Sequence, residues 1–502
     1  MNYFFSVFIL FSLCSAQYRS DFMISDSGSK PTFDIDSDNN IHIVWISSKK
    51  DDRSTMYIGL DSLGNSLYEI RRISNSFYTN DPNIETRKNT SAIVWEDGVS
   101  SSVTIFSSYI KGRVFKNGLP IGNEFQIDDG DFNHAAIDAF RKYPKILWHN
   151  DSILFSTWSG QGHHSKTYSQ SDIYAEKLLM PIQKSGDNYP LNNTSVRTDY
   201  EEIRPIKKIA SNGYVLLWAE RDSQKVSRIS GIQCTDSLKP TSPKFTLIEF
   251  DTLTYLYRPT AIQKNDGNII ILWSKDTLTN KANIYWQEFT ENGAAIGGKI
   301  KVNEALAKIS STISSHRDIG GNIIVVWEDG QNIMAQRFSE NSTKIGTNFI
   351  VNGNLTGIDN FPKVRLHKNK IFTVWTKRNS SVPSMTSIWM NILDFKNPVL
   401  NVKNNSIVTN NFDLYQNFPN PFNGMTTIHY NLSFESTVSI KIFNILGQEI
   451  KEIVHQQQDK GLYEARWNTE LSSGIYFCRL EALSVDGKRR KFISTRKMQL
   501  LR

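Results

Sequence analysis

Seven tryptophans, each at the end of a short apolar run, divide most of the chain into similar units. Successive members of the set are 48 to 63 residues apart. A spacing of this size is typical of a β-propeller, in which each blade is a four-stranded sheet. We therefore predict an all-β chain with a seven-bladed β-propeller over residues 17–397. The seven residues are Trp45, Trp95, Trp158, Trp218, Trp273, Trp327 and Trp375.

The sixth unit shows how one blade is read from its residues. Residues 323–327 are apolar without interruption, which is typical of a strand buried on both faces. Residues 332–338 alternate between polar and apolar, which indicates a strand with one polar side. Because each tryptophan ends a buried run of this kind, we interpret all seven as core residues of the blades rather than as carbohydrate-stacking residues.

The third unit is the least regular of the seven. Residues 128–144 and 159–171 have the composition of insertions. A six-bladed ring with a distorted extra segment therefore remains an alternative.

The seventh unit lacks a distinct outer strand. Residues 22–24, followed by Ser-Asp, resemble the outer strand of another unit at residues 125–127, which is followed by Asp-Asp. We predict that residues 22–24 complete the last blade, so that both ends of the body meet and no sheet edge is left free.

Composition excludes several classes of protein. Of the three cysteines, Cys234 and Cys478 remain after removal of an N-terminal signal, and one lies in each predicted domain. A disulfide framework is therefore excluded. The formal net charge of +7 is spread along the chain, and residues 488–491 form its one dense basic run. We predict no nucleic-acid partner and, without a phosphate-binding glycine loop, no cofactor.

The N-terminus is typical of a secretory signal. Residues 3–13 form an apolar run that is too short to span a bilayer. Small residues follow up to Ala16. We predict a signal peptide over residues 1–16, cleavage between Ala16 and Gln17, and no transmembrane segment in the mature chain.

Residues 412–502 contain a series of short motifs in a fixed order. An Asn-Phe-Pro-Asn-Pro-Phe-Asn run comes first, alternating strand patterns and two glycine turns follow, and a Lys-Met pair stands near the end. The motif residues are Asn417, Phe418, Pro419, Asn420, Pro421, Phe422, Asn423, Gly447, Gly474, Tyr476, Lys497 and Met498.

These motifs resemble the type A C-terminal sorting domain of the type IX secretion system, by which Bacteroidetes-type bacteria carry proteins across the outer membrane. The resemblance implies a small immunoglobulin-like β-sandwich over residues 412–502, after a linker at residues 398–411. It also implies recognition by the outer-membrane translocon and removal by a sortase, which can attach the body to anionic lipopolysaccharide. We expect the protein to pass through the periplasm and to be secreted or anchored at the cell surface.

We expect the molecular function to lie in the loops of the propeller. The segments after the tryptophans are predicted to share one rim of the ring, where mixed charges suit polar ligands. We therefore predict a non-enzymatic binding or interaction protein, with a polysaccharide or protein ligand on this rim. The charged rim segments are residues 49–53, 96–97, 160–171, 220–222, 275–276, 328–329 and 377–378.

The alternative is a glycan-active hydrolase of the sialidase-like propeller type. The Ser-X-Asp-X-Gly-X-Thr-Trp boxes of that family are absent, so we assign no catalytic residue. Two convergent carboxylates at the centre of the ring would favour the enzyme. We predict no metal site: His163 and His164 lack a spaced third ligand, and residues 34–38 begin like a calcium loop without its final glutamate.

Overall fold

The computed structural model contains only β-strands as regular elements in the part of the chain that it describes. No helix in this part could cross a membrane. The all-β fold class is confirmed. The predicted signal peptide, the Ala16/Gln17 cleavage site and the linker at residues 398–411 lie outside the described residues and stay predictions.

The structure describes residues 21–49, 52–100, 106–128, 141–161, 171–180, 183–184, 189–191, 204–207, 213–221, 224, 226–250, 256–276, 281–308, 312–353, 358–379, 385–396, 412–414, 417, 420–459, 461–485 and 491–501.

Within these residues, the strands of the body form seven antiparallel sheets. The first sheet contains β2 (Ser29–Ile35), β3 (Ile41–Ile46), β4 (Thr55–Leu60) and β5 (Arg71–Arg72), and the second contains β6 (Thr79–Arg87), β7 (Thr90–Ser100), β8 (Phe106–Lys116) and β9 (Leu119–Gln126). The third contains β10 (Arg141–Trp148), β11 (Ile153–Gln161), β12 (Ser171–Leu179), β13 (Gln183–Lys184) and β14 (Tyr189–Pro190), and the fourth contains β15 (Arg204–Lys207), β16 (Gly213–Arg221), β17 (Ser227–Thr235) and β18 (Phe245–Glu249).

The remaining three sheets follow the same order. The fifth contains β19 (Leu256–Gln263), β20 (Ile269–Asp276), β21 (Lys281–Phe289), β22 (Ala295–Lys301) and β23 (Ala307–Lys308), and the sixth contains β24 (Ser314–Arg317), β25 (Ile323–Glu328), β26 (Ile333–Phe338) and β27 (Lys344–Ile350). The seventh contains β28 (Ile358–His367), β29 (Lys370–Arg378), β30 (Thr386–Asp394) and β1 (Phe22–Ser25).

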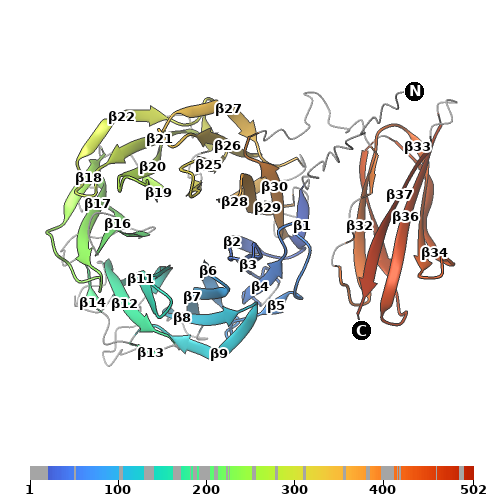
Figure 1. Cartoon of the computed structure of the whole chain (residues 1–502), viewed down its shortest axis with the longest axis horizontal. Helices are drawn as coiled ribbons and strands as arrows, with labels where there is room; N and C mark the ends of the chain where they lie inside the picture. The colour runs from blue at the N-terminus through green and yellow to red at the C-terminus, as the bar shows by residue number, and fades with distance from the viewer. Residues whose placement is uncertain are drawn as a thin grey trace, which may run out of the picture.

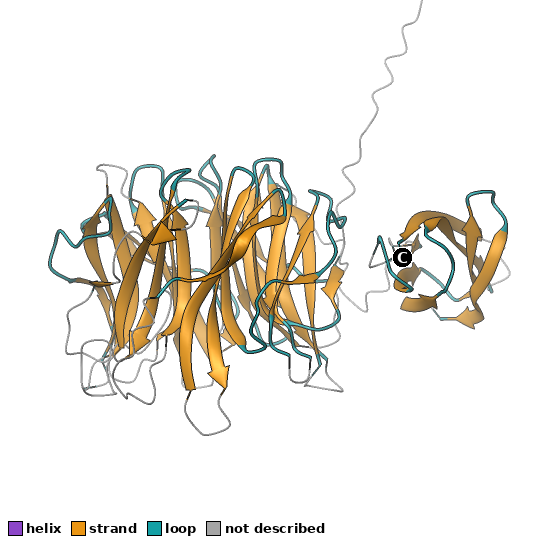
Figure 2. Ribbon diagram, turned by 90° about the horizontal axis from the view of Figure 1, so that it is seen from below, coloured by secondary structure: helices purple, strands orange, loops and turns teal. Residues whose placement is uncertain are grey.

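The seven sheets follow one another around a ring (Figure 1). The first strand of each sheet, here called the inner strand, lies nearest the centre. The second is called the tryptophan strand because each contains one of the seven tryptophans. Seen from the side, the strands run along the ring axis, so the turns gather at its two ends (Figure 2). The start of each inner strand and the end of each tryptophan strand therefore share one end.

The hydrophobic core of the body lies between the sheets. Seven clusters of buried residues each combine two neighbouring sheets. Each tryptophan belongs to the cluster shared with the preceding sheet, and none of the seven is more than 4% exposed. Trp45 belongs to the cluster that joins the first sheet to the seventh, which closes the ring.

A reciprocal pair of hydrogen bonds ends the outer strand in several sheets. The backbone N–H of Val351 donates to the Ile333 carbonyl at 2.8 Å, and the Asn352 side chain accepts the Ile333 N–H at 2.8 Å. The second bond needs a short polar side chain, and the residue before it is apolar because it is buried in the core. Together these requirements explain the recurring sequence pattern at this position. The same arrangement joins Ile73 and Ser74 to Thr55, Ile127 and Asp128 to Ile110, and Val302 and Asn303 to Ile284.

The segment at residues 34–38 is part of a hairpin. Oδ1 of Asp36 accepts the N–H groups of Asp38 at 2.9 Å and Asn40 at 2.7 Å. Oδ2 accepts the Asn40 side-chain amide at 2.9 Å and lies 3.1 Å from Nε2 of the buried His42. The carboxylate oxygens thus hold the turn together.

In the third sheet, the prediction that residues 128–144 and 159–171 are insertions was wrong in part. Residues 141–144 belong to β10 and residues 159–161 to β11, so these parts of the supposed insertions are paired strand. The apolar run ends earlier than the strand because polar residues at a strand end still pair along the ladder. Ser171 likewise begins β12, and Asp128 accepts the Ile110 N–H. Residues 129–140 and 162–170, with His163 and His164, lie outside the described residues.

The closing strand is confirmed. Phe22 pairs with Met390 and Met23 with Trp389, so β1 completes the sheet of β30. Asp21, just before the strand, is held by the backbone N–H of Gly353 and by the side-chain amide of Asn391, each at 2.7 Å.

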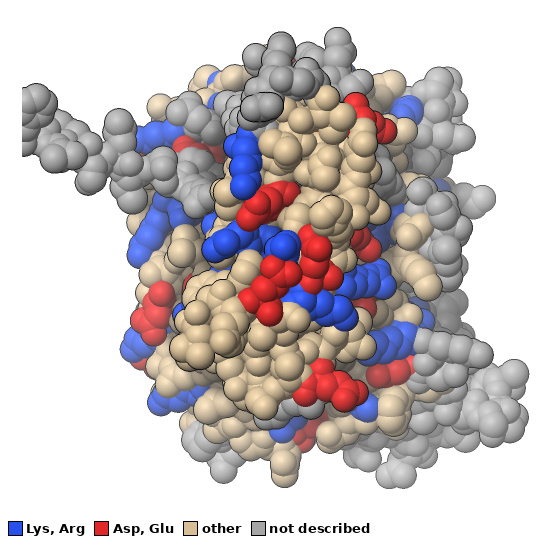
Figure 3. Space-filling view, turned by 90° about the vertical axis from the view of Figure 1, so that its right-hand side faces the viewer, with Lys and Arg blue, Asp and Glu red and all other residues tan. Residues whose placement is uncertain are grey.

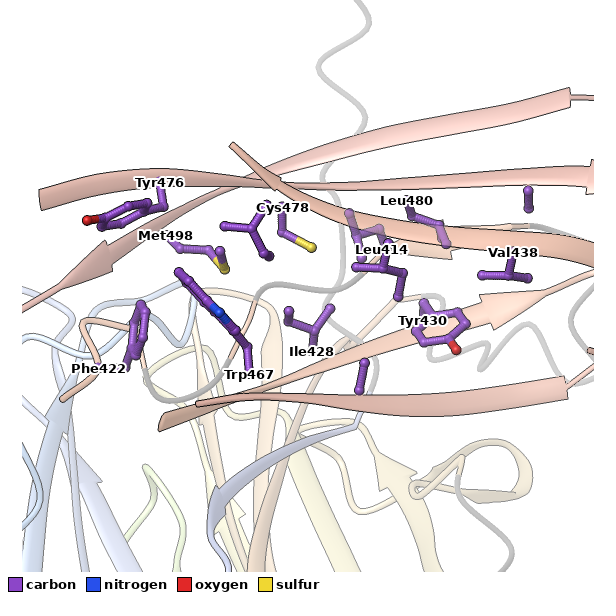
Figure 4. Packing of buried hydrophobic residues seen from close by; sticks show 14 of the residues in the cluster. Leu414, Phe422, Ile428, Tyr430, Val438, Trp467, Tyr476, Cys478, Leu480 and Met498 are labelled. Atoms are coloured by element: carbon purple, nitrogen blue, oxygen red, sulfur yellow. The ribbon is translucent and has the colours of Figure 1, made fainter. Parts of the chain in front are cut away.

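The C-terminal region forms two facing sheets with their own core (Figure 4). Buried residues of both sheets meet there, among them Cys478. Both remaining cysteines are free and buried, and burial raises the pKa of the Cys234 and Cys478 thiols to about 12. One sheet contains β31 (Asp413–Leu414), β32 (Met425–Leu432) and β35 (Gly461–Asn468), and the other β34 (Glu449–Gln458), β33 (Ser436–Asn444), β36 (Gly474–Ser484) and β37 (Lys491–Leu500).

Charges of opposite sign alternate on the surface. On the side of the molecule in Figure 3, basic and acidic side chains lie next to one another rather than in separate patches. Ion pairs in the C-terminal region follow this pattern, with Lys441 and Glu449 at 2.9 Å and Lys491 and Glu481 at 3.1 Å. Exposed pairs of this kind add little stability.

Deletion of residues 17–26 should lower the melting temperature by about 5 °C or more, because it removes β1 and uncovers the edge of β30. Asp21→Ala is the smaller test, and loss of its two hydrogen bonds should cost about 1–3 kcal/mol. Asp26→Ala, at an exposed position next to the strand, is the control. Unchanged melting of the deletion variant would contradict a stabilising role for β1.

Candidate functional site

The first motif of the C-terminal region is bonded to the last strand. Oδ1 of Asn420 accepts the backbone N–H of Gln499 at 2.7 Å, and its Nδ2 donates to the Lys497 carbonyl at 3.3 Å. The N–H of Phe422 donates to the Gln499 carbonyl at 2.9 Å, and the Phe422 carbonyl accepts the N–H of Leu501 at 2.9 Å. These bonds join the Asn-Phe-Pro-Asn-Pro-Phe-Asn run to the Lys-Met end of the chain.

A cluster of aromatic residues lies under this junction (Figure 4). The ring of Phe422 is 5.4 Å from Trp467, which is 5.7 Å from Tyr476 in an edge-on contact. Met498 in the same core is fully buried. The motif thus contributes both backbone bonds and core packing, and Trp467 is a member that we did not predict.

The other motif residues have separate local roles. Asn417 is buried and donates to the Thr426 hydroxyl at 2.9 Å. Gly447 has φ of +75° in the turn between β33 and β34, a conformation that favours glycine. Gly474 begins β36. Pro421 and Asn423 flank Phe422 in the first motif, Lys497 is exposed on β37, and Phe418 and Pro419 lie outside the described residues.

In the propeller, several charged residues predicted for the rim turns lie inside strands. Glu96, Glu220, Glu328 and Lys377 belong to tryptophan strands and are at most 8% exposed. The prediction of turns was wrong here, because these strands continue past the tryptophan. They pair with the inner strand at Glu96 and Lys377, and with the third strand of the sheet at Glu220 and Glu328. Their side chains therefore lie between sheets.

Two of these groups form hydrogen bonds that join neighbouring sheets or hold one sheet together. Glu328 accepts the backbone N–H of Phe361 in the next sheet at 2.7 Å. Glu220 accepts the Ser230 hydroxyl at 2.7 Å and the Lys244 ammonium at 2.8 Å. Such bonds satisfy groups that would be costly to bury alone.

Glu96 belongs to a cluster of polar side chains between the first and second sheets. Nζ of Lys30 donates to Asn80 at 2.9 Å and to Asp81 at 2.8 Å, and Asn80 donates to Glu96 at 3.4 Å. Burial raises the pKa of Glu96 to about 7, and the nearby Asp81 carboxylate acts in the same direction. A carboxyl group with this pKa can both donate and accept a proton near neutral pH.

No group of three or more His, Cys, Asp or Glu residues in the described part of the chain is arranged to hold a metal ion.

The C-terminal geometry agrees with the comparison with protein families. Residues 416–494 match the model of the secretion system C-terminal sorting domain. The C-terminal region is a type IX secretion sorting domain. The protein is therefore exported, and is secreted or attached to the cell surface. The junction of Asn420 and Phe422 with β37 lies within and just beyond the matched part of the sorting domain.

Three solved structures resemble the chain in fold. Polysaccharide lyase Uly1 is 9% identical with a TM-score of 0.50, over 75% of this chain and 99% of that chain. An α-L-arabinofuranosidase of Fusarium graminearum is 8% identical with a TM-score of 0.45, over 76% and 99%. A mutant Trypanosoma rangeli sialidase is 10% identical with a TM-score of 0.43, over 94% and 89%. The propeller context of the sorting domain is confirmed. No curated protein matches the chain in sequence.

Glu96→Gln should alter the pH dependence of stability. Between the ordinary glutamate pKa of 4.5 and the folded pKa of about 7, the folded chain keeps a proton that the unfolded chain releases. The free energy of unfolding therefore falls as pH rises through this window. The substitution should remove about 1–3 kcal/mol of that fall between pH 5 and 8, as measured by denaturant unfolding. Parallel curves for both proteins would show that Glu96 titrates normally.

Proposed function

We propose that this protein is a non-enzymatic binding or interaction protein of the cell surface, which the type IX system exports through its sorting domain. The propeller is the binding body, and its ligand is a polysaccharide or another protein. The translocon and the sortase are the partners of the sorting domain. The mature chain needs no cofactor for this role and has no nucleic-acid partner.

This proposal is supported by the charged residues at one end of the ring, which are already engaged in bonds with other residues of the body. Glu328 and Glu220 are engaged in bonds between or within sheets, and Asp97 is paired with Lys111. Groups used in this way stiffen a scaffold. A stiff scaffold that presents loops at two ends is the usual basis of a binding surface.

Removal of residues 412–502 tests the export part. We expect the truncated protein to accumulate in the periplasm, while the complete chain is found outside the cell or on its surface. Fractionation and immunoblotting measure the distribution. Asn420→Ala, which loses two bonds to β37, should reduce export in the same direction. Delivery of the truncated chain at the level of the complete one would contradict the role of the sorting domain.

A glycan-active hydrolase is the second candidate, favoured by the pair of Glu96 and Asp81. A protonated Glu96 could act as a general acid beside an ionised Asp81, as glycosidases require. Glu96→Gln should then lower the rate of glycan hydrolysis at least about 100-fold and leave binding intact. Hydrolysis assays of the complete chain on every glycan that it binds, with Glu220→Gln as control, distinguish a hydrolase from a binding protein. Binding without hydrolysis would support the non-enzymatic role.

A further inference from the structure

Five inner strands contain a β-bulge opposite the tryptophan of the neighbouring strand. In each, two residues of the inner strand face one residue of the tryptophan strand, and the second of the two is a proline. The pairs are Lys30-Pro31, Asp81-Pro82, Tyr143-Pro144, Arg258-Pro259 and Phe361-Pro362. Repetition at one position of the sheet places all five near the same end of the ring.

Four of these positions have a strained backbone. The residue before the proline has φ of +51° at Lys30, +41° at Asp81, +57° at Tyr143 and +53° at Phe361. Residues other than glycine adopt this region at a cost, and it is unusual for large side chains. Glycine would form the same bulge without that cost. These positions therefore retain a side chain where glycine would avoid the strain.

The four strained residues lie in adjacent sheets. Phe361 is in the seventh, Lys30 in the first, Asp81 in the second and Tyr143 in the third. Their inner strands β28, β2, β6 and β10 contact one another in this order. We call the four residues the inner-strand arc. Two aromatic residues stand at its ends and a charged pair stands in the middle.

The charged pair is held in place and is still partly exposed. Nζ of Lys30 lies 2.8 Å from Oδ1 of Asp81, and the side chains are 26% and 17% exposed. The backbone N–H of Lys30 donates to the Thr376 hydroxyl at 3.0 Å, and that of Phe361 donates to Glu328 at 2.7 Å. The preceding sheet therefore holds the bulges at Lys30 and Phe361 without a ligand.

Two buried groups beside the arc lack hydrogen-bond partners among the described residues. They are Nζ of Lys377 and Oδ1 of Asp359, in residues that are 8% and 2% exposed. The two residues are paired across β28 and β29, and Asp359 stands two residues before Phe361. The two charges act on each other, and Nζ of Lys377 also lies 5.0 Å from the centre of the Trp389 ring, but neither atom has a hydrogen bond within the described part of the chain. A hydroxyl group that reached this position would supply that bond to both.

We propose that the inner-strand arc binds a neutral, hydroxyl-rich saccharide. An ammonium that donates and a carboxylate that accepts, side by side, match the hydroxyl groups on neighbouring carbons of a sugar ring. The two aromatic residues match its apolar C–H faces. The pairing of Lys30 with Asp81 leaves the middle of the arc without net charge, which favours a neutral sugar over an acidic one. This inference rests on the proposed binding function and assigns its location and ligand class.

The test is calorimetric titration of residues 17–502 with hexasaccharides of β-glucan, xylan, mannan and arabinan, and with hexagalacturonate as the acidic counterpart. We expect at least one neutral hexasaccharide to bind. Tyr143→Gly and Phe361→Gly should each weaken its binding about tenfold or more, while the melting temperature stays within a few degrees because the lost packing is offset by relief of strain.

Lys368→Gly is the matched control. Lys368 also has a positive φ, of +49°, but it is exposed at the turn between β28 and β29, at the other end of the ring from Phe361. This variant should bind as the unaltered chain does. A variant that loses binding because it unfolds is recognised from its melting temperature, and Asp81→Asn then tests the arc with a smaller change.

Three results would overturn the inference. Binding that Tyr143→Gly, Phe361→Gly and Asp81→Asn all leave unchanged would place the ligand elsewhere, and the proposed binding function would survive. Preference for hexagalacturonate would refute the neutral class but not the binding function. Failure of all five hexasaccharides to bind would reject a saccharide on the arc, while a protein ligand would remain open to capture experiments.

Discussion

Each sheet of the body is covered on its two faces by its neighbours, and the rest of the structure depends on this packing. The seven clusters of buried residues lie between sheets, and each tryptophan fills the space toward the preceding one. A four-stranded sheet with two apolar faces would lose about 25 cal/mol for every Å² left in water. An open row of such sheets would expose one apolar face at each end. The cluster that joins the seventh sheet to the first removes that loss, and β1 secures the closure with backbone bonds.

The same packing explains where the charged residues lie. Tryptophan strands extend beyond their apolar run, so the next side chains enter the space between sheets. There they bind backbone N–H groups or opposite charges, as Glu328 binds Phe361 and Asp97 binds Lys111. Glu328 thereby holds Phe361 of the inner-strand arc. The rigid ring thereby holds side chains of four sheets in a set arrangement.

The sorting domain has a core that contains none of the residues of the body. Its order does not depend on the ring, which agrees with its role as a separable export signal. Within it, the first motif and the last strand form one unit through Asn420 and Phe422. Motifs that are far apart in sequence belong together because they meet at this junction.

Local patterns were sufficient to predict the strands, the position of the tryptophans and the closing strand. Apolar runs and the apolar–polar pair at the outer strand end, as in Ile127 and Asp128, report burial and a short-range bond. Predictions were wrong where a strand is longer than its apolar run. Glu96 and Glu220 were predicted in turns, and residues 141–144 in an insertion, but all lie in strands. At these points the polar side chain is paired by a neighbouring strand or sheet, and no nearby residue signals it.

The sequence by itself determined that the chain is all-β, that its body repeats around buried tryptophans, and that its end is an export domain. These properties depend on residues close together in the chain or on a motif series with fixed spacing. Only the tertiary structure decided which charged groups are buried and that Phe361, Lys30, Asp81 and Tyr143 form one arc. Closure of the ring brings the seventh sheet against the first, and the left-handed backbone of Lys30 and Phe361 is held by bonds from the preceding sheet.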